Sequence, residues 1–363
     1  ELEVSRSLAL AFVALIAVLP EYAVDFVFAW NAASDPAQAH YATANMTGSN
    51  RLLIGFGWAV VALLFWNRRR RQPLLLDPRQ KLEMTFLLLA TGWAFTIFFR
   101  TLVIDGPGGA AGSLNIVDSI VLVALFVAYM AMSSRGKAAE EHEVVVGPMA
   151  AIAALPRPKR RLALLLMFIV PAVVIFSVAE PFAESLVATG KDVGVDEFFL
   201  VQWVAPLASE APEIGIAFYF AIRGMGAMAM GVLISSKVNQ WTMLVGTLPI
   251  VYSVSLGALG QLPMDTRQVD EFLITAAQSL FAVLLIVAMR MYWPGAVALL
   301  LLFIIQFFFT GETGRLVFSS IYLGLAFLIM AASRARRQAA WNMLAWAAKG
   351  FRAPGPAPVP GEA

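Results

Sequence analysis

The sequence contains no cysteine and only two histidines, His40 and His142, in 363 residues. Disulfides, zinc–thiolate sites and iron–sulfur clusters are therefore excluded, and both histidines fall in polar connecting segments. Any metal chemistry must use oxygen ligands. Charge is also scarce, because Asp, Glu, Lys and Arg together make up only 14% of the chain and the formal net charge is +2. This near balance gives a nucleic-acid partner no electrostatic basis.

Apolar residues, by contrast, make up 60% of the chain. About ten apolar runs reach or approach the roughly 20 residues that a helix needs to cross a bilayer. These runs are 5–31, 42–66, 82–104, 116–133, 162–188, 196–222, 226–256, 270–290, 293–310 and 315–333. They are continuously apolar rather than alternating, which excludes a membrane β-barrel. We expect an all-α polytopic membrane protein in contact with membrane lipids.

The loops between the runs differ in their content of Lys and Arg. The loops after the second and fourth runs are basic, whereas the opposite loops hold only Lys191 and Arg267. Because basic loops stay on the cytoplasmic side, this pattern places a linker at 134–161 and a tail at 334–363 in the cytoplasm. The absence of organelle-targeting signals favours a bacterial cytoplasmic membrane.

Two motifs recur in the same order in the two halves of the chain. Val18-Leu19-Pro20-Glu21 corresponds to Ser209-Glu210-Ala211-Pro212-Glu213, and the spacing from Asn50 to Gly57 equals that from Asn239 to Gly246. The charge bias orients the two Pro-Glu runs in opposite directions. An inverted repeat of this kind, with polar groups near the midplane, is the architecture of secondary transporters.

Each Pro-Glu pair has a chemical consequence inside a membrane. Proline removes a backbone hydrogen bond, so we expect the helices to open at Pro20 and Pro212 and to free carbonyl oxygens. A carboxylate in hydrocarbon is costly and persists mainly beside a cation, a cavity or a counter-charge. Glu21 and Glu213 with freed carbonyls would form an oxygen cage that suits Ca²⁺, Na⁺ or exchanging protons. The alternative is that each pair is a helix kink with a snorkelling acid.

At these motifs the chain resembles the calcium/cation antiporter superfamily of sodium/calcium exchangers and their calcium/proton relatives. Each half of such a protein has a Pro-Glu helix followed by a Gly-Ser-Asn helix, as Gly48-Ser49-Asn50 has here. The resemblance implies ten helices in two inverted halves, 1–133 and 162–310, with an additional membrane helix at 311–333. It also implies that the first helix of the first half lies upstream of residue 1, because the chain begins at the Pro-Glu run.

The resemblance assigns roles to particular residues. Glu21 and Glu213 take the two central positions that bind the metal or other cation. The remaining predicted cation ligands are Glu210, Ser209, Ser49 and Thr242, and the predicted modulators are Asp25, Asn50, Lys237 and Asn239. Four family oxygen ligands are lost, at Ala17, Val18, Leu53 and Val238. Because the carboxylates have moved, ion selectivity does not transfer from the family.

Two fixed cations occur near these motifs. Lys237 replaces a glycine of the second motif, and Arg51 follows Asn50. A lysine facing Glu210 or Glu213 would compete with a bound metal, while the alternative for both cations is a structural counter-ion or a snorkelling side chain.

The sequence thus predicts a secondary cation antiporter of the sodium/calcium exchanger type, which exchanges Ca²⁺ or another cation against Na⁺ or H⁺ and needs no cofactor. The first alternative is a monovalent-cation (Na⁺ or K⁺)/proton antiporter on the same fold. The second is a membrane sensor or enzyme, although no pattern of nucleophile or metal dyad supports an enzyme. A passive channel is third, because inverted repeats suit alternating access better than an open pore.

Overall fold

The protein is described by a computed structural model that covers residues 18–69, 71–104, 112–134, 151–152 and 154–351. The expectations for Ala17, for most of the linker and for the last residues of the tail lie outside these ranges. All regular secondary structure in the described ranges is helical apart from four strands of two residues each. The predicted all-α class is therefore confirmed.

The helices follow one another in two comparable series. The first series comprises α2 (Leu19–Asn31), α3 (Ala37–Leu52), a π-helical segment (Leu53–Trp58), α4 (Ala59–Arg68), α5 (Lys81–Ile104) and α6 (Ile116–Ser133). The second comprises α8 (Arg157–Val193), α9 (Glu197–Ile222), α10 (Gly226–Asn239), a π-helical segment (Gln240–Leu244), α11 (Val245–Leu256), α12 (Thr266–Ile286) and α13 (Trp293–Gln306). Two further helices, α14 (Glu312–Ala332) and α15 (Arg334–Ala348), complete the fold.

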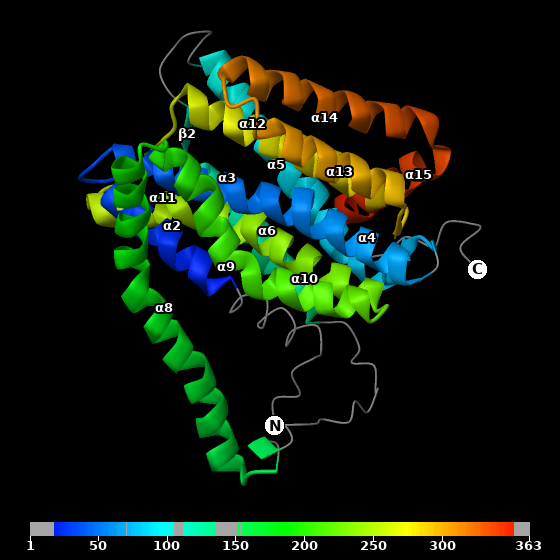
Figure 1. The fold of residues 1–363 in the computed structure, drawn as a ribbon, viewed down its shortest axis with the longest axis horizontal. Helices are drawn as coiled ribbons and strands as arrows, with labels where there is room; N and C mark the ends of the chain where they lie inside the picture. The colour runs from blue at the N-terminus through cyan, green and yellow to red at the C-terminus, as the bar shows by residue number, and fades with distance from the viewer. Residues whose placement is uncertain (1–17, 70, 105–111, 135–150, 153, 352–363) are drawn as a thin grey trace.

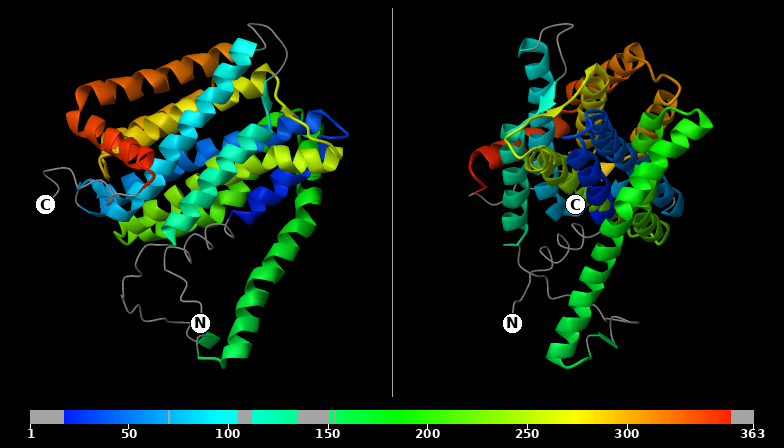
Figure 2. Two further views of the ribbon diagram at one scale, coloured as in Figure 1. Left: turned by 180° about the vertical axis from the view of Figure 1, so that it is seen from behind. Right: turned by 90° about the vertical axis from the view of Figure 1, so that its left-hand side faces the viewer.

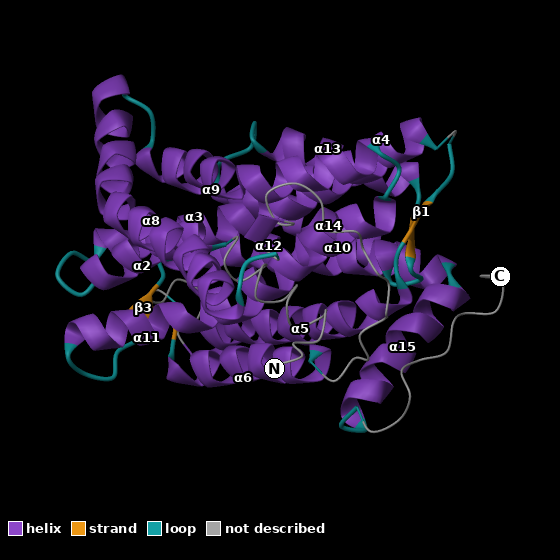
Figure 3. Ribbon diagram, turned by 90° about the horizontal axis from the view of Figure 1, so that it is seen from below, coloured by secondary structure: helices purple, strands orange, loops and turns teal. Residues whose placement is uncertain are grey.

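The two series run in opposite directions. In Figure 1, α3 leads rightward into α4, whereas α10 leads leftward into α11. The strands obey the same relation, because β1 (Leu74–Leu75) pairs with β4 (Arg290–Met291) and β2 (Ser113–Leu114) pairs with β3 (Leu262–Pro263), both antiparallel. Each pair joins a loop of one series to the complementary loop of the other, and β1 and β3 lie at opposite ends of the molecule (Figure 3). The repeat predicted from Pro20-Glu21 and Pro212-Glu213 is thus an inverted repeat in the fold.

Six helical segments within the described ranges are long and apolar enough to cross a membrane. They are Ala37–Arg68, Pro78–Thr101, Ile116–Ser133, Arg157–Val193, Thr266–Ile286 and Glu312–Ala332, and Trp293–Gln306 is a shorter apolar helix. Helix α9 has 26 residues, which is sufficient length, but polar residues including Glu210 and Glu213 interrupt its apolar sequence. The polar residues that reduce the apolar signal are those of the candidate site.

Helix α8 differs from the others in length and packing. Its 37 residues span about 55 Å at 1.5 Å per residue, and they begin at Arg157, five residues before the predicted run. Its last part packs on α2 and α9, while its first part lies apart from the other helices and exposes apolar side chains such as Leu162 and Val173 (Figures 1 and 2). The helix ends at Gly194, whose φ of +72° is the left-handed conformation that glycine adopts readily.

The helix ends follow ordinary capping chemistry. The side chains of Asn115, Asp196 and Asp265 accept hydrogen bonds from backbone amides in the first turns of α6, α9 and α12. These short polar residues explain why each helix begins where the apolar pattern begins. The tail contains a feature that the sequence analysis did not predict, because α15 forms a helix at 334–348 and packs on α5 and α14.

The predicted opening of the backbone at Pro212 is wrong. Helix α9 continues through both Pro206 and Pro212, so each proline removes one amide donor without ending the helix. Pro20 lies in the first turn of α2, where proline is tolerated. The irregular backbone lies instead in the two π-helical segments, which begin at Leu53, three residues after Asn50, and at Gln240, directly after Asn239. π-helical turns of this kind occur frequently at functional sites.

One close backbone contact fixes the position of α3 against α9. Pro206 has no amide to give to the carbonyl of Gln202, and Gly48 of α3 packs directly on that carbonyl. A Cβ atom on Gly48 would lie only 1.8 Å from the Gln202 oxygen. Glycine is therefore required at this crossing, which carries Ser49 and Asn50 to the centre of the molecule.

Candidate cation site

Three carboxylates from the two repeats meet in the interior. Glu21 belongs to the first turn of α2, and Glu210 and Glu213 lie one turn apart on α9. Their exposed fractions are 1%, 2% and 3%. Glu21 lies within electrostatic range of Glu213, and Glu210 within range of both. The structure therefore brings together the acids that the sequence placed at the two Pro-Glu motifs.

Gln240 connects these acids. It is the first residue of the second π-helical segment, its Nε2 donates a hydrogen bond to Oε1 of Glu210, and its side chain also lies beside the Glu21 carboxyl. The Ser49 hydroxyl lies beside the same carboxyl. One oxygen-rich cluster is thus formed by α2, α3, α9 and the π-helical segment.

Many oxygens of this cluster have no hydrogen-bond partner among the described residues. They are both carboxylate oxygens of Glu21, Oε2 of Glu210, Oε2 of Glu213, Oγ of Ser49 and Oε1 of Gln240. Leaving buried polar atoms unpaired costs free energy, and a buried charge without a partner costs more. A group of buried oxygens with free lone pairs matches a hard cation, which binds several oxygen ligands at once.

The acids alone do not form a compact metal centre. Within the described ranges, no group of three or more His, Asp or Glu side chains is gathered closely enough to hold a metal ion. A cation that bound between Glu21 and Glu213 would therefore also need neutral oxygens; the Ser49 hydroxyl lies beside Glu21, and Oε1 of Gln240 is buried without a hydrogen-bond partner within these ranges.

Two of the predicted ligands have hydrogen-bond partners in their own helices. The Thr242 hydroxyl donates to the carbonyl of Val238 at 2.5 Å, and the Ser209 hydroxyl donates to the carbonyl of Pro206 at 3.3 Å. Each hydroxyl oxygen retains lone pairs, so both residues remain candidate ligands only through those lone pairs.

The predicted modulators Asp25 and Asn239 each have a partner on another helix. The Nδ2 of Asn45 on α3 donates a hydrogen bond to Oδ1 of Asp25 at 2.8 Å. Tyr22 donates its hydroxyl to Asn239 at 2.7 Å and joins the two repeats. Sequence reasoning missed Tyr22, whose only signal was its position next to Glu21.

Lys237 and Asn50 form a pair inside the molecule. Lys237 is fully buried, and its Nζ lies 2.5 Å from Oδ1 of Asn50 and 3.5 Å from the Asn50 carbonyl oxygen. The ammonium also lies 4.4 Å from the ring centre of Trp241. Glu210 and Glu21 are within its electrostatic range, so Lys237 faces the acid cluster without a direct ion pair to it.

Arg51 points away from this cluster and belongs to a separate ionic network. Its guanidinium lies 2.5 Å from Glu271 on α12 and 4.7 Å from the ring centre of Trp203. Arg315 of α14 lies 3.9 Å from Glu271 and 3.6 Å from Asp270. Arg51 is thus a structural counter-ion, which is the alternative role that the sequence left open for it.

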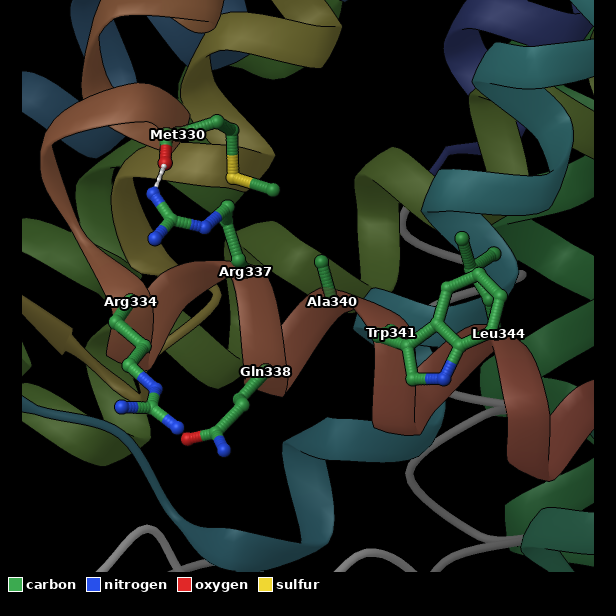
Figure 4. A pocket seen from close by; sticks show the side chains of 7 residues that line it. All are labelled: Met330, Arg334, Arg337, Gln338, Ala340, Trp341 and Leu344. Atoms are coloured by element: carbon green, nitrogen blue, oxygen red, sulfur yellow. Dashed lines mark hydrogen bonds between the residues drawn. The ribbon is translucent and has the colours of Figure 1, made fainter.

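A hollow between α14 and α15 lies outside this site. Met330, Arg334, Arg337, Gln338, Ala340, Trp341 and Leu344 line it (Figure 4). Arg337 donates to the Met330 carbonyl at 2.6 Å, and the lining contains no carboxylate. The hollow therefore has no feature of a cation site.

Comparisons with known proteins agree with this geometry. The profile of the family described as sodium/calcium exchanger protein matches residues 3–135 and 163–311. A crystal structure of the H⁺/Ca²⁺ exchanger CAX is 43% identical, with a TM-score of 0.85, and the match covers 94% of this chain and 83% of that chain. A structure of the sodium-calcium exchanger NCX_Mj soaked with Na⁺ and Ca²⁺ is 18% identical, with a TM-score of 0.52, and covers 84% of this chain and 86% of that chain. No curated protein matches the chain.

Proposed function

Because the chain belongs to the sodium/calcium exchanger protein family, we propose that it exchanges Ca²⁺ for H⁺ across a membrane. The protein is an integral membrane cation antiporter and not an enzyme. The choice of Ca²⁺ and H⁺ follows its 43% identity with the H⁺/Ca²⁺ exchanger CAX. The sensor and channel alternatives lose their basis with the family assignment.

The observation that carries the proposal is the buried group of unpaired oxygens on Glu21, Glu210 and Glu213. Carboxylates bind Ca²⁺ through charge and oxygen donors, and they bind protons at the same atoms. Ca²⁺ and H⁺ therefore compete for one set of sites. Competition at a site that opens to one side at a time is sufficient for exchange.

The roles of the individual residues belong to the same proposal. Glu21 and Glu213 bind the cation, Glu210 adds a third charge that Gln240 orients, and Ser49 contributes a neutral oxygen. Ser209 and Thr242 contribute at most a lone pair each. Residues 1–133 and 162–310 form the two halves that move relative to each other, and 311–333 is the additional helix.

The same proposal includes the orientation. Arg68 ends α4, with Arg69 and Arg71 just after it, and Arg334 and Arg337 lie in the first turn of α15, which follows α14. If these basic ends face the cytoplasm, the linker 134–161 and the tail 334–363 are cytoplasmic, and the membrane is the cytoplasmic membrane of a bacterium.

The test is a flux measurement in proteoliposomes that contain a trapped pH indicator. We expect external Ca²⁺ to drive a pH change in the lumen, and we expect Na⁺ or K⁺ at the same ionic strength to drive none. Glu213→Gln removes a charge from the cluster with little change in shape and should abolish the Ca²⁺ response. Glu312→Gln is the matched control, because Glu312 is an exposed acid in the first turn of α14. Full transport by Glu213→Gln would disprove the assignment of the site.

A second candidate function is monovalent-cation/proton exchange. It is favoured by the loss of side-chain oxygens at Leu53 and Val238 and by the hydrogen bond that occupies the Thr242 hydroxyl. A cage with fewer ligands suits a cation of lower charge. In the same experiment, a pH response to Na⁺ or K⁺ alone would select this candidate.

A further inference from the structure

The position of Lys237 relative to the repeat is unusual. The alignment of Asn50 with Asn239 places Lys237 opposite Gly48. In the first repeat this position must be glycine, because α3 packs on the Gln202 carbonyl. In the second repeat it carries the longest unbranched cationic side chain, which is completely buried. The second repeat therefore places a positive charge inside the molecule, whereas the corresponding position of the first repeat has no space for a side chain.

The surroundings of the Lys237 ammonium are those of a bound cation. Oδ1 and the carbonyl oxygen of Asn50 lie 2.5 and 3.5 Å from Nζ, and the face of Trp241 lies on it at 4.4 Å. Carbonyl oxygens and aromatic faces are the neutral groups that attract a monovalent cation. The amide of Asn50 is held in turn by the Met46 carbonyl, which fixes Oδ1 toward the lysine.

The charged groups around the ammonium are mostly acids. Glu21 and Glu210 lie within its electrostatic range, Glu213 lies beside them, and Asp25 lies near Glu21. Arg51 follows Asn50 in sequence, but it is paired with Glu271. Lys237 is therefore the cation that these acids face within the described residues, and a second monovalent cation placed against Asn50 would meet its repulsion.

We propose that Lys237 is a tethered monovalent cation that takes one position of the cation site, at the Asn50 oxygens, and thereby prevents Na⁺ and K⁺ from binding there. This inference rests on the proposed function, because it takes Glu21, Glu210 and Glu213 as the site of the transported cation. It assigns to Lys237 the role of a specificity-determining residue.

The test measures Na⁺ binding to the purified full chain in detergent, so that it does not depend on transport. Equilibrium binding of ²²Na⁺ should show no Na⁺ that Ca²⁺ displaces in the wild type. Lys237→Met, whose side chain is one atom shorter and carries no charge, leaves the position of Nζ open and should gain about one such Na⁺ per protein. Lys237→Arg keeps a fixed charge and should bind no Na⁺. In proteoliposomes, Na⁺ should inhibit Ca²⁺ exchange by Lys237→Met at a concentration at least ~10-fold lower than for the wild type.

Each outcome decides the inference. If Ca²⁺ displaces bound Na⁺ from the wild type, the inference is wrong. It is also wrong if Lys237→Met remains monodisperse and active but gains no Na⁺ binding. If Lys237→Met is not monodisperse, Lys237→Gln is used, which keeps a polar tip for Asn50, and the same gain is required. Addition of methylammonium to Lys237→Ala should exclude Na⁺ again, which a purely structural lysine would not explain. Failure of the proposed function appears separately, as absence of a Ca²⁺-driven pH change in the wild type.

Discussion

Replacement of Gly48 by alanine tests how α3 and α9 hold the site together. The added Cβ would lie 1.8 Å from the Gln202 oxygen and 2.8 Å from its carbonyl carbon. A carbon normally approaches a carbonyl oxygen to about 3.3 Å, so the helices would have to separate by about 1.5 Å. Neither side can yield by a rotamer change, because both obstacles are backbone atoms. Overpacking costs about 1–3 kcal/mol where side chains can adjust, so we expect Gly48→Ala to cost about 3 kcal/mol or more.

The assay is thermal unfolding in detergent, followed by the fluorescence of the buried Trp58 and Trp241. For a chain of this size, 1 kcal/mol corresponds to about 1.3 °C in Tm, so Gly48→Ala should lower Tm by about 4 °C or more, or prevent folding. Protein that does fold should lose Ca²⁺-driven exchange, because Ser49 moves with α3.

Gly215→Ala is the matched control for this substitution. Gly215 is a glycine of α9 itself, and nothing lies within 4 Å of the position of its Cβ. Alanine is favoured over glycine inside a helix by about 1 kcal/mol, so Tm should stay constant or rise slightly. A Gly48→Ala protein with the Tm and the exchange rate of Gly215→Ala would refute the reasoning.

Two further predictions concern ion pairs away from the site. Arg51→Met leaves Glu271 buried without the partner that lies 2.5 Å away, and it should lower the free energy of unfolding by about 3 kcal/mol. The double variant Arg51→Met, Glu271→Leu should recover much of the lost Tm, because no buried charge then lacks that partner. A double variant that is less stable than Arg51→Met would contradict this prediction. Burial raises the pKa of Asp265, but hydrogen bonds from His40 and from the Gln268 amide outweigh it, so the pKa lies below its ordinary value. Its stabilising contribution is present above about pH 3.9 and is lost as the pH falls through the lowered pKa. The difference in Tm between wild type and Asp265→Asn should therefore shrink on acidification below that pH, and a constant difference would disprove the link.

The central acids could be predicted from the sequence because each is a carboxylate next to proline in an apolar run, and this pattern occurs twice. A carboxylate in an apolar run is costly unless a cation, a cavity or a counter-charge accompanies it. Glu21 and Glu213 occur at corresponding positions of the two repeats, so the same indication is present twice. The inverted order of the helices followed from the same repeat and from the charge of the loops. Ser49 was predicted by its place in the Gly-Ser-Asn motif, and the structure places it beside Glu21.

The remaining features depend on tertiary packing and left little trace in the sequence. Gln240 is one amide among several in apolar helices, and such amides more often join helices than bind ions. Its role beside Glu210 became visible only once α9 and the second π-helical segment lay together. The π-helical segments themselves have no sequence signature. Proline predicted a broken helix at Pro212, but the neighbouring helices keep α9 continuous.

The two repeats share a backbone plan and differ in what they place inside it. Position 48 admits only a hydrogen atom, and this brings α3 into contact with the Gln202 carbonyl, to which Pro206 has no amide to donate. Position 237 admits an entire lysine, which extends to Asn50 of the first repeat. At this one aligned position the first repeat thus has a close backbone contact, at Gly48, and the second has a buried charge, at Lys237. Because an inverted repeat exchanges the conformations of its halves during alternating access, halves that differ in packing and charge at this position cannot be energetically equivalent in the two states.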